Sequence, residues 1–140
     1  MRVCFLDING KYNALSPLHS PLGGTESAIC YLARALARRG HEISILNKTD
    51  MPGEYGQVYS LNTDKSLNIE YLNSRDVIIC SNAAVLGKNF KDSGITTALV
   101  FWTGHDSNQP AVKDLALEEI RSAWTKLVLV SDWQLSLIHI

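Results

Sequence analysis

Residues 21–46 of this 140-residue chain read PLGGTESAICYLARALARRGHEISIL, and the pattern predicts a turn, a helix, a second turn and a strand. Apolar side chains recur at helical spacing from Glu26 to Arg39 and give this helix one apolar stripe. Thr25 is the expected N-cap, and Gly40 is expected to stop the helix before the strand that ends at Leu46. The stretch is therefore half of a strand–helix–strand unit.

Two glycines, Gly23 and Gly24, stand immediately before this helix. Glycine lets a backbone come close to a ligand, and the free amide groups of a helix N-terminus attract anions, so the pair predicts contact with a phosphate. The alternative interpretation is a turn that opens the helix and touches no ligand. For Glu26, in the first helical turn, we favour a structural role, since its negative charge complements the helix dipole.

The composition indicates one soluble globular domain. Hydrophobic residues make up 46% of the chain, enough for a core, and the formal net charge of -1 gives no reason to expect a nucleic-acid partner. A strand begins directly after Met1, without a basic region and a long apolar segment, so we expect neither a signal peptide nor a membrane span. Cys4, Cys30 and Cys80 lie far apart in apolar segments, and we interpret them as buried free thiols of a cytoplasmic protein, with no metal site.

Short apolar runs alternate with helical patterns along the chain. Strands are expected at Val3–Leu6, Ile43–Leu46, Gln57–Leu61, Val77–Cys80, Ala98–Trp102 and Leu127–Val130. Further helices are expected at Lys65–Asn73, Val85–Asp92 and Pro110–Trp124. Strands that are apolar on both faces and separated by helices form parallel sheets covered on both sides. The predicted fold class is therefore α/β, a doubly wound, mostly parallel, Rossmann-like sheet with helices on both faces.

Polar residues follow the predicted strands, at the ends where doubly wound sheets bind their ligands. The first strand is followed by a loop that runs from Asp7 through Asn9 to Gly24 and is longer than most connections. The polar positions after the later strands are Ser81, Asn82, Thr103, Gly104, His105, Asp106, Ser131 and Asp132. Several of these residues are expected to face one crevice.

Each of these residues also has a structural interpretation. We favour it for Asp7 as a capping group, for Asp106 as a local turn acceptor and for Ser131 as the N-cap of a final helix. His105 would then be a turn residue bonded to nearby backbone, and a ligand or catalytic role is its alternative. Trp102, near the end of a predicted strand, is expected in the core.

Three motifs occur in order along the chain. The first is PLGGTE at residues 21–26, continued to RGHEI at residues 39–43; the others are FWTGHD at residues 101–106 and VSDWQ at residues 130–134. Together they resemble the N-terminal domain of the nucleotide-sugar glycosyltransferases of family four, enzymes of the GT-B fold. In that family a glycine pair and a glutamate open the first helix. The resemblance covers essentially everything up to Gln134.

The resemblance implies roles for individual residues. Gly23 and Gly24 would let the loop approach the diphosphate of a nucleotide-sugar donor, and His105 would be the catalytic residue that lines the cleft near the transferred sugar. The acceptor side would be shaped by Asn9, Asp106 and Ser131. The family retains anomeric configuration and needs neither a metal ion nor another cofactor, so amide dipoles and basic side chains would stabilise the leaving diphosphate.

One departure from the family concerns domain organisation. Its enzymes have two facing Rossmann-like domains, and the second, which carries the nucleotide pocket, has no counterpart here. We therefore interpret residues 1–134 as the acceptor-side domain of a fragment that is expected to be inactive alone, with a glycan, lipid or small-molecule acceptor. With a lipid acceptor we would expect contact with the inner membrane face.

The last six residues have a separate interpretation. Residues 135–140 read LSLIHI, which is what a transposon mosaic-end sequencing adaptor encodes in one frame. The hypothesis is that these residues are a non-native tail.

Two other classes of protein stay open. A dinucleotide-dependent oxidoreductase shares the sheet, but its G-x-G-x-x-G fingerprint does not follow the first strand, where the sequence is Asp7-Ile8-Asn9-Gly10. A non-catalytic, receiver-like signalling or binding domain also begins with a strand that ends in an aspartate, but it would need clustered acidic residues there. NAD binding would favour the first class, and a defined protein partner without nucleotide binding would favour the second.

Overall fold

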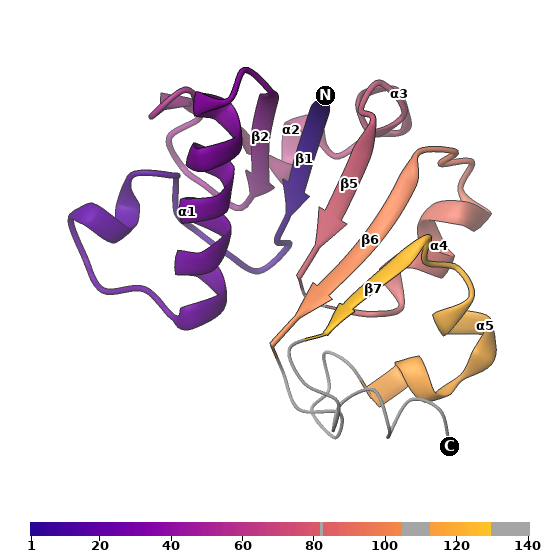
Figure 1. Ribbon diagram of the computed structural model, residues 1–140. Coiled ribbons are helices and arrows are strands. Elements are labelled where there is room, and N and C mark those ends of the chain that lie inside the picture. Colours follow the sequence, from indigo (N-terminus) through magenta and orange to yellow (C-terminus); the bar gives the residue numbers. More distant parts are fainter. Residues whose placement is uncertain (82, 105–112, 130–140) are drawn as a thin grey trace.

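The computed structural model describes residues 1–81, 83–104 and 113–129, which form a seven-stranded sheet. The strands lie in the order β3-β4-β2-β1-β5-β6-β7 (Figure 1). Their bounds are β1 Arg2–Leu6, β2 Glu42–Asn47, β3 Gly53–Tyr55, β4 Val58–Asn62, β5 Val77–Cys80, β6 Ala98–Thr103 and β7 Lys126–Leu129. All neighbouring pairs are parallel except β3 with β4. The predicted α/β, Rossmann-like fold class is confirmed.

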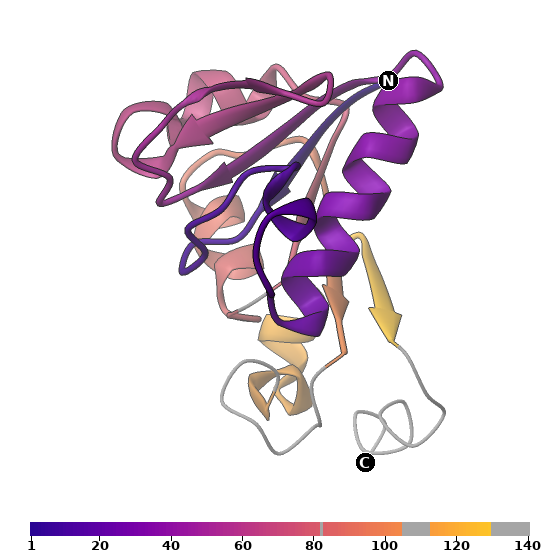
Figure 2. The same ribbon diagram turned by 90° about the vertical axis from the view of Figure 1, so that its left-hand side faces the viewer.

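Helices cover both faces of this sheet. The helix α1 (Gly24–Arg38) follows β1 and runs back along it, so that its last turn lies near the chain's N-terminus in both views (Figures 1 and 2). The other helices are α2 Thr63–Ser66, α3 Ile69–Asn73, α4 Leu86–Asp92 and α5 Glu118–Arg121, with short 3-10 turns η1 Ser16–Leu18 and η2 Lys113–Ala116. We call the sheet face that packs against α1 the α1 face, and the opposite one the α4 face.

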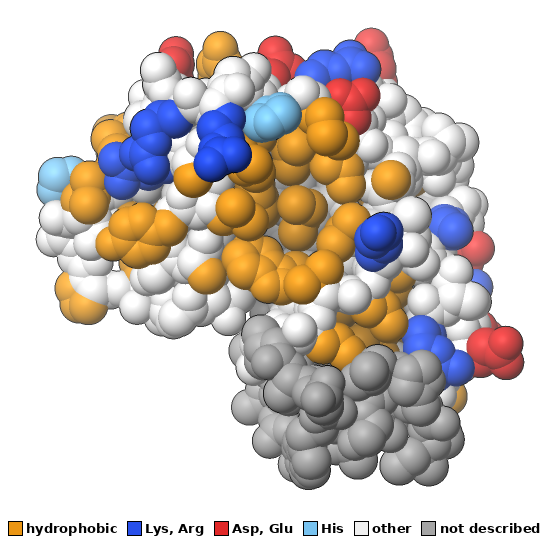
Figure 3. Space-filling view, viewed as in Figure 1, with side chains coloured by type: hydrophobic (Ala, Val, Ile, Leu, Met, Phe, Trp, Pro, Cys, Tyr) orange, Lys and Arg blue, Asp and Glu red, His pale blue; other side chains and the backbone are white. Residues whose placement is uncertain are grey.

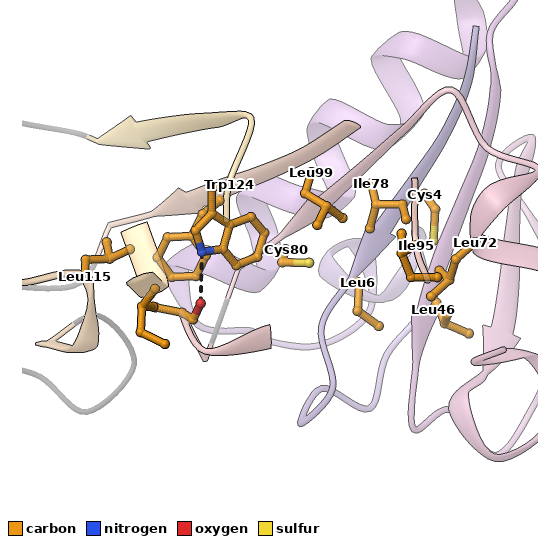
Figure 4. Close-up of a cluster of buried hydrophobic side chains, with 13 residues drawn as sticks. Cys4, Leu6, Leu46, Leu72, Ile78, Cys80, Ile95, Leu99, Leu115 and Trp124 are labelled. Atoms are coloured by element: carbon orange, nitrogen blue, oxygen red, sulfur yellow. Dashed lines mark hydrogen bonds between the residues drawn. The ribbon is translucent and has the colours of Figure 1, made fainter. Parts of the chain in front are cut away.

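Each face carries its own hydrophobic core. On the α1 face, Ile29, Cys30 and Ala33 of α1 pack with Val3 and Phe5 of β1 and with neighbouring strand residues. On the α4 face, side chains of α3, α4 and α5 pack with the alternate residues of the same strands (Figure 4). The residues labelled there are Cys4, Leu6, Leu46, Leu72, Ile78, Cys80, Ile95, Leu99, Leu115 and Trp124. Continuous apolar strand sequences thus supply both cores, as expected for a parallel sheet.

Helix α4 approaches Trp124 closely at one glycine. A Cβ atom on Gly87 would lie 2.6 Å from Cε2 of the Trp124 indole, so a larger residue does not fit without a shift. The indole Nε1–H donates to the carbonyl of Ala84 at 2.9 Å, the dashed line in Figure 4. This contact ties the segment before α4 to the end of the α5 segment.

The sheet contains one strand that the sequence analysis missed. β3 and β4 form an antiparallel hairpin around Gly56 and Gln57, which both have positive φ angles, 60° and 67°. Two successive positive φ angles are typical of the type I′ turn that suits two-residue hairpins. Gly56 is a usual residue for this turn, whereas Gln57 is not, which is why the sequence showed only the second strand of the pair.

Two of the predicted helices are interrupted. The expected helix at Lys65–Asn73 is two short helices, because the side chain of Asn68 accepts a hydrogen bond from the Tyr71 amide at 2.8 Å and starts a new helix there. In the described part of Pro110–Trp124, η2 and α5 are separated by Leu117, which has an extended ψ angle of 124°. Arg121 donates to the Leu115 carbonyl at 3.0 Å and thereby satisfies an acceptor near this break. A single helix over these residues was therefore wrong.

In the described part of the chain, no helix is both long and apolar enough to cross a membrane.

Candidate functional site

The carboxyl ends of the central strands gather polar residues that are buried. Asp7 follows β1, Ser81 follows β5 and Thr103 ends β6, and each is at most 2% exposed. Side chains alternate between the two faces along a strand, so Asp7 and Ser81 lie on the α1 face, as does Trp102 of β6. Asp7, Ser81 and Trp102 therefore share the α1 face at this edge of the sheet, whereas Thr103 lies on the α4 face with Phe101.

Asp7 holds the first part of the long loop that follows β1. The Tyr12 hydroxyl donates to Oδ2 of Asp7 at 2.7 Å in a buried position, and Asn47 Nδ2 donates to the Tyr12 carbonyl at 3.0 Å. Burial, followed by the neighbouring Asp7 carboxylate, raises the pKa of Tyr12 and keeps the phenol protonated. These contacts support the structural interpretation of Asp7.

The packing of this loop also explains why residue 10 is a glycine. A Cβ atom on Gly10 would lie 2.4 Å from the Tyr12 ring and 2.6 Å from the Asp7 carboxylate, and the Gly10 carbonyl accepts from the Lys48 amide at 2.8 Å. The glycine is needed for close packing between the loop and the strand ends. It therefore serves the fold.

The start of α1 differs from the prediction by two residues. Gly23, not Thr25, is the N-cap, and the Glu26 carboxylate accepts a hydrogen bond from the Gly23 amide at 2.9 Å. A small polar side chain was expected at the cap, but glycine takes this position because Glu26 closes the cap from three residues away. The structural role of Glu26 is thus supported by a direct contact.

Gly24, the first residue of α1, has no comparable structural reason to be glycine. A Cβ atom built on it would meet no atom within 4 Å, and its φ angle is not among the positive values. Within the described residues, no side chain or carbonyl accepts from the backbone amides of Gly24 and Thr25. The helix therefore starts with exposed donors and open space beside them.

That open space is a pocket of about 180 Å³ between α1 and the end of β6. It is lined by Gly24, Thr25, Ala28, Trp102 and Gly104. Figure 3 shows hydrophobic side chains gathered over α1 and the adjoining sheet face. The structure thus places Gly24, the first residue of α1, beside the end of β6, where the FWTGHD motif begins.

Trp102 is the site residue that the sequence analysis placed in the core. It is only partly buried, and it contributes to the pocket wall. Phe101, its neighbour in β6, is 0% exposed on the α4 face. The alternation of β6 was the available signal, since it places Phe101 and Trp102 on opposite faces.

Ser81 has a further feature at the same edge. Its hydroxyl is buried and has no hydrogen-bond partner among the described residues. An unsatisfied buried hydroxyl costs about 1–3 kcal/mol, so the fold gains no stability from this group.

The other residues singled out from sequence are placed as follows. Asn9 is exposed in the turn after β1 and does not line the pocket. Gly23 is exposed at the N-cap, next to the pocket residue Gly24. His105, Asp106 and Ser131, like Asn82 and residues 135–140, lie outside the described residues.

The cysteines are buried free thiols, as predicted. Burial raises the pKa of Cys4 to about 11 and that of Cys30 to about 12. Over residues 1–81, 83–104 and 113–129, no three His, Cys, Asp or Glu side chains gather closely enough to hold a metal ion.

Comparison with known proteins adds no further assignment to this geometry. No family model, no curated protein and no solved structure matches the chain.

Proposed function

We propose that this chain is the acceptor-side domain of a retaining, nucleotide-sugar-dependent glycosyltransferase. The observation that carries the proposal is Gly24, a glycine that the fold does not need, at the first turn of a long helix beside a pocket. Glycine loses more backbone freedom on folding than any other residue, so a reason outside the fold favours it here. Close approach of a ligand to the backbone is such a reason.

The ligand part that suits this position is a diphosphate. The amides of Gly24 and Thr25, which have no acceptor among the described residues, are hydrogen-bond donors at the positive end of a 15-residue helix, which favours anions. The Glu26 carboxylate, held at the Gly23 amide, lies close to the same helix end and opposes a second negative charge. We therefore expect weak diphosphate binding, with a dissociation constant on the order of 1 mM, and a second domain would supply most of the donor affinity.

In this proposal the transferred sugar leaves the donor diphosphate at the carboxyl edge of the sheet. The bond between the anomeric carbon and the diphosphate oxygen breaks, and a bond to the acceptor oxygen forms on the same side of the sugar ring. The acceptor proton passes to the departing diphosphate, whose negative charge the α1 amides stabilise. No metal or other cofactor takes part.

The remaining roles rest on the resemblance of the FWTGHD and VSDWQ motifs. His105, the residue after Gly104, would hydrogen-bond the transferred sugar or the acceptor, while Asn9, Asp106 and Ser131 would border the acceptor. Gly104, the residue before His105 in the sequence, lines the pocket. A glycan, lipid or small molecule could then be the acceptor, and a lipid acceptor would bring the protein to the inner membrane face.

The test is a residue-resolved titration of the ¹⁵N-labelled chain with inorganic pyrophosphate and with UDP, followed by NMR. We expect saturable shifts of the Gly24 and Thr25 amides, and a loss of these shifts in Gly24→Val, whose larger side chain blocks approach to the backbone. Ala35→Val is the matched control, because it places the same side chain on the same helix three turns away. Unchanged binding by Gly24→Val would refute the proposed diphosphate contact. Micromolar binding of NAD would instead favour a dinucleotide-dependent oxidoreductase.

A further inference from the structure

The pocket beside Trp102 is too small for a whole donor molecule. Its volume is about 180 Å³, whereas pockets that bury drug-sized ligands have volumes of about 300–1,000 Å³. The space corresponds to roughly six water molecules at about 30 Å³ each. It therefore holds one ring and leaves the rest of a larger ligand outside.

Among the residues that the structure describes, none of those that line the pocket has an ionisable side chain. Gly24, Thr25 and Ala28 form the α1 side, and Trp102 and Gly104 form the β6 side. The strand register continues this apolar surface from Trp102 to Val128 of β7, which is 42% exposed. A charged group placed against these residues would lose hydration without gaining an ion pair, so they favour a neutral occupant.

The indole of Trp102 gives the pocket a preference for a ligand that presents C–H groups on one side. An indole has a large apolar area and a negatively polarised face, which attracts the weakly positive hydrogens on carbon. A pyranose presents such C–H groups on one side and hydroxyl groups around its rim. Thr25 lines the opposite wall, and its hydroxyl is a hydrogen-bonding group that suits such a rim.

We propose that this pocket binds one neutral pyranose ring against Trp102, so that the acceptor is a glycoside or glycan. The inference rests on the proposed function and specifies its acceptor class. Ala28 and Gly104 act in it as specificity-determining positions, because their small size leaves the space that the ring fills.

The experiment is an NMR titration of the ¹⁵N-labelled chain with four neutral probes, the methyl glycosides of glucose, galactose, mannose and N-acetylglucosamine. We expect at least one of them to shift the Trp102 indole Nε1–H and the Ala28 and Gly104 amides in a saturable way. Trp102→Leu should weaken that binding at least tenfold, and Ala28→Leu, which fills the pocket, should abolish it. Val128→Ala, next to Trp102 but outside the pocket, should leave it within twofold.

Three results would overturn the inference. One is the absence of pocket shifts with all four glycosides, and another is glycoside binding that survives Ala28→Leu in a variant with an otherwise native spectrum. The third is tighter binding of n-hexanol than of any glycoside, which would indicate an alkyl group in the pocket. Pyrophosphate is titrated into the same samples: shifts of Gly24 with pyrophosphate but not with glycosides would refute the pyranose site and leave the proposed diphosphate contact intact.

Discussion

The two faces of strands β5 to β7 differ in how they are covered, although they belong to the same strands. On the α4 face, Leu99 and Phe101 are 0% exposed beneath α4 and α5. On the α1 face, Trp102 is partly buried and Val128 is 42% exposed. Seven strands span about 30 Å, whereas one helix is about 10 Å wide. Helix α1 therefore leaves apolar sheet surface beside it (Figure 3). The pocket lies between α1 and the end of β6.

The comparison teaches that stability and recognition can be assigned to alternate residues of one strand. In β6, Phe101 contacts the Trp124 ring, with ring centroids 5.0 Å apart, whereas Trp102 lines the pocket. The following predictions test this division, from the largest expected effect to the smallest.

The protection of the buried thiols from a reagent should be the largest effect, because the thiols react only when the fold opens. Cys4 and Cys80 lie in the core of the α4 face, and Cys30, a residue of α1, lies in the core of the α1 face. Native chain should react with Ellman's reagent more slowly than urea-unfolded chain by a factor on the order of 10³ or more, since the folded state must open first. Fast reaction of Cys30 alone would show that α1 covers its face less firmly than the structure indicates.

The same thiols give a pH dependence. Burial raises the folded-state pKa values of Cys4 and Cys30, so the unfolded thiols ionise first as the pH rises. Their contribution to stability is complete below the ordinary pKa of about 8.5 and decreases above it. Urea unfolding at pH 7.5 and 9.5 should show lower stability at the higher pH, and a smaller difference in Cys4→Ala.

Truncation of the two aromatic residues of β6 should have unequal effects. Phe101→Ala should lower the free energy of unfolding by about 3–5 kcal/mol, as for a fully buried aromatic side chain. Trp102→Ala should lower it by about 1–2 kcal/mol, because this side chain is already partly in water. Urea denaturation measures both, and equal losses would contradict the difference between the faces.

Replacement of a glycine by alanine should also change the stability differently on the two faces of the sheet. Gly87→Ala should destabilise the chain by about 1–3 kcal/mol, because its Cβ would lie 2.6 Å from the Trp124 ring. Gly24→Ala should be neutral or stabilise the chain by up to about 1 kcal/mol, since its Cβ enters open space. Thermal unfolding of the two variants checks this, and a destabilised Gly24→Ala would mean that the fold itself requires Gly24.

Two buried serines should show the smallest effect, with opposite signs. Ser44, on the α4 face, shares a 2.6 Å hydrogen bond with the Tyr71 hydroxyl, so Ser44→Ala should cost about 1 kcal/mol. Ser60, on the α1 face, has no partner for its hydroxyl in the described part of the chain, so Ser60→Ala should gain up to about 1 kcal/mol. A loss of stability in Ser60→Ala, measured in urea, would contradict the second expectation.

Much of the fold could be predicted from local pattern, because parallel strands are apolar on both faces and α1 has an apolar stripe. The breaks at Asn68 and Leu117 could not, since each depends on specific bonds rather than on helical spacing. The hairpin before β4 was missed because Gln57 takes a positive φ angle that its residue type rarely adopts.

The candidate site was predictable only in outline. Sequence placed polar residues at the carboxyl ends of the strands, and Asp7 and Ser81 do lie there. It could not distinguish Gly10, which Tyr12 and Asp7 crowd, from Gly24, which faces open space. That distinction depends on neighbours brought together by the fold. The roles of His105, Asp106 and Ser131 stay predictions.

The central position of β1 has a consequence for the order in which the chain can fold. β1 pairs with β2 on one side and with β5 on the other, so Arg2 lies next to Glu42 and Val3 next to Val77. Closing such long stretches of chain slows folding, because the entropy of the loops is lost before the contacts form. During synthesis β1 leaves the ribosome before β2 and β5, and both of its edges can be paired only after residues 77–80 have emerged. Until then β1 is an apolar strand with an unpaired edge, and such strands are prone to aggregation.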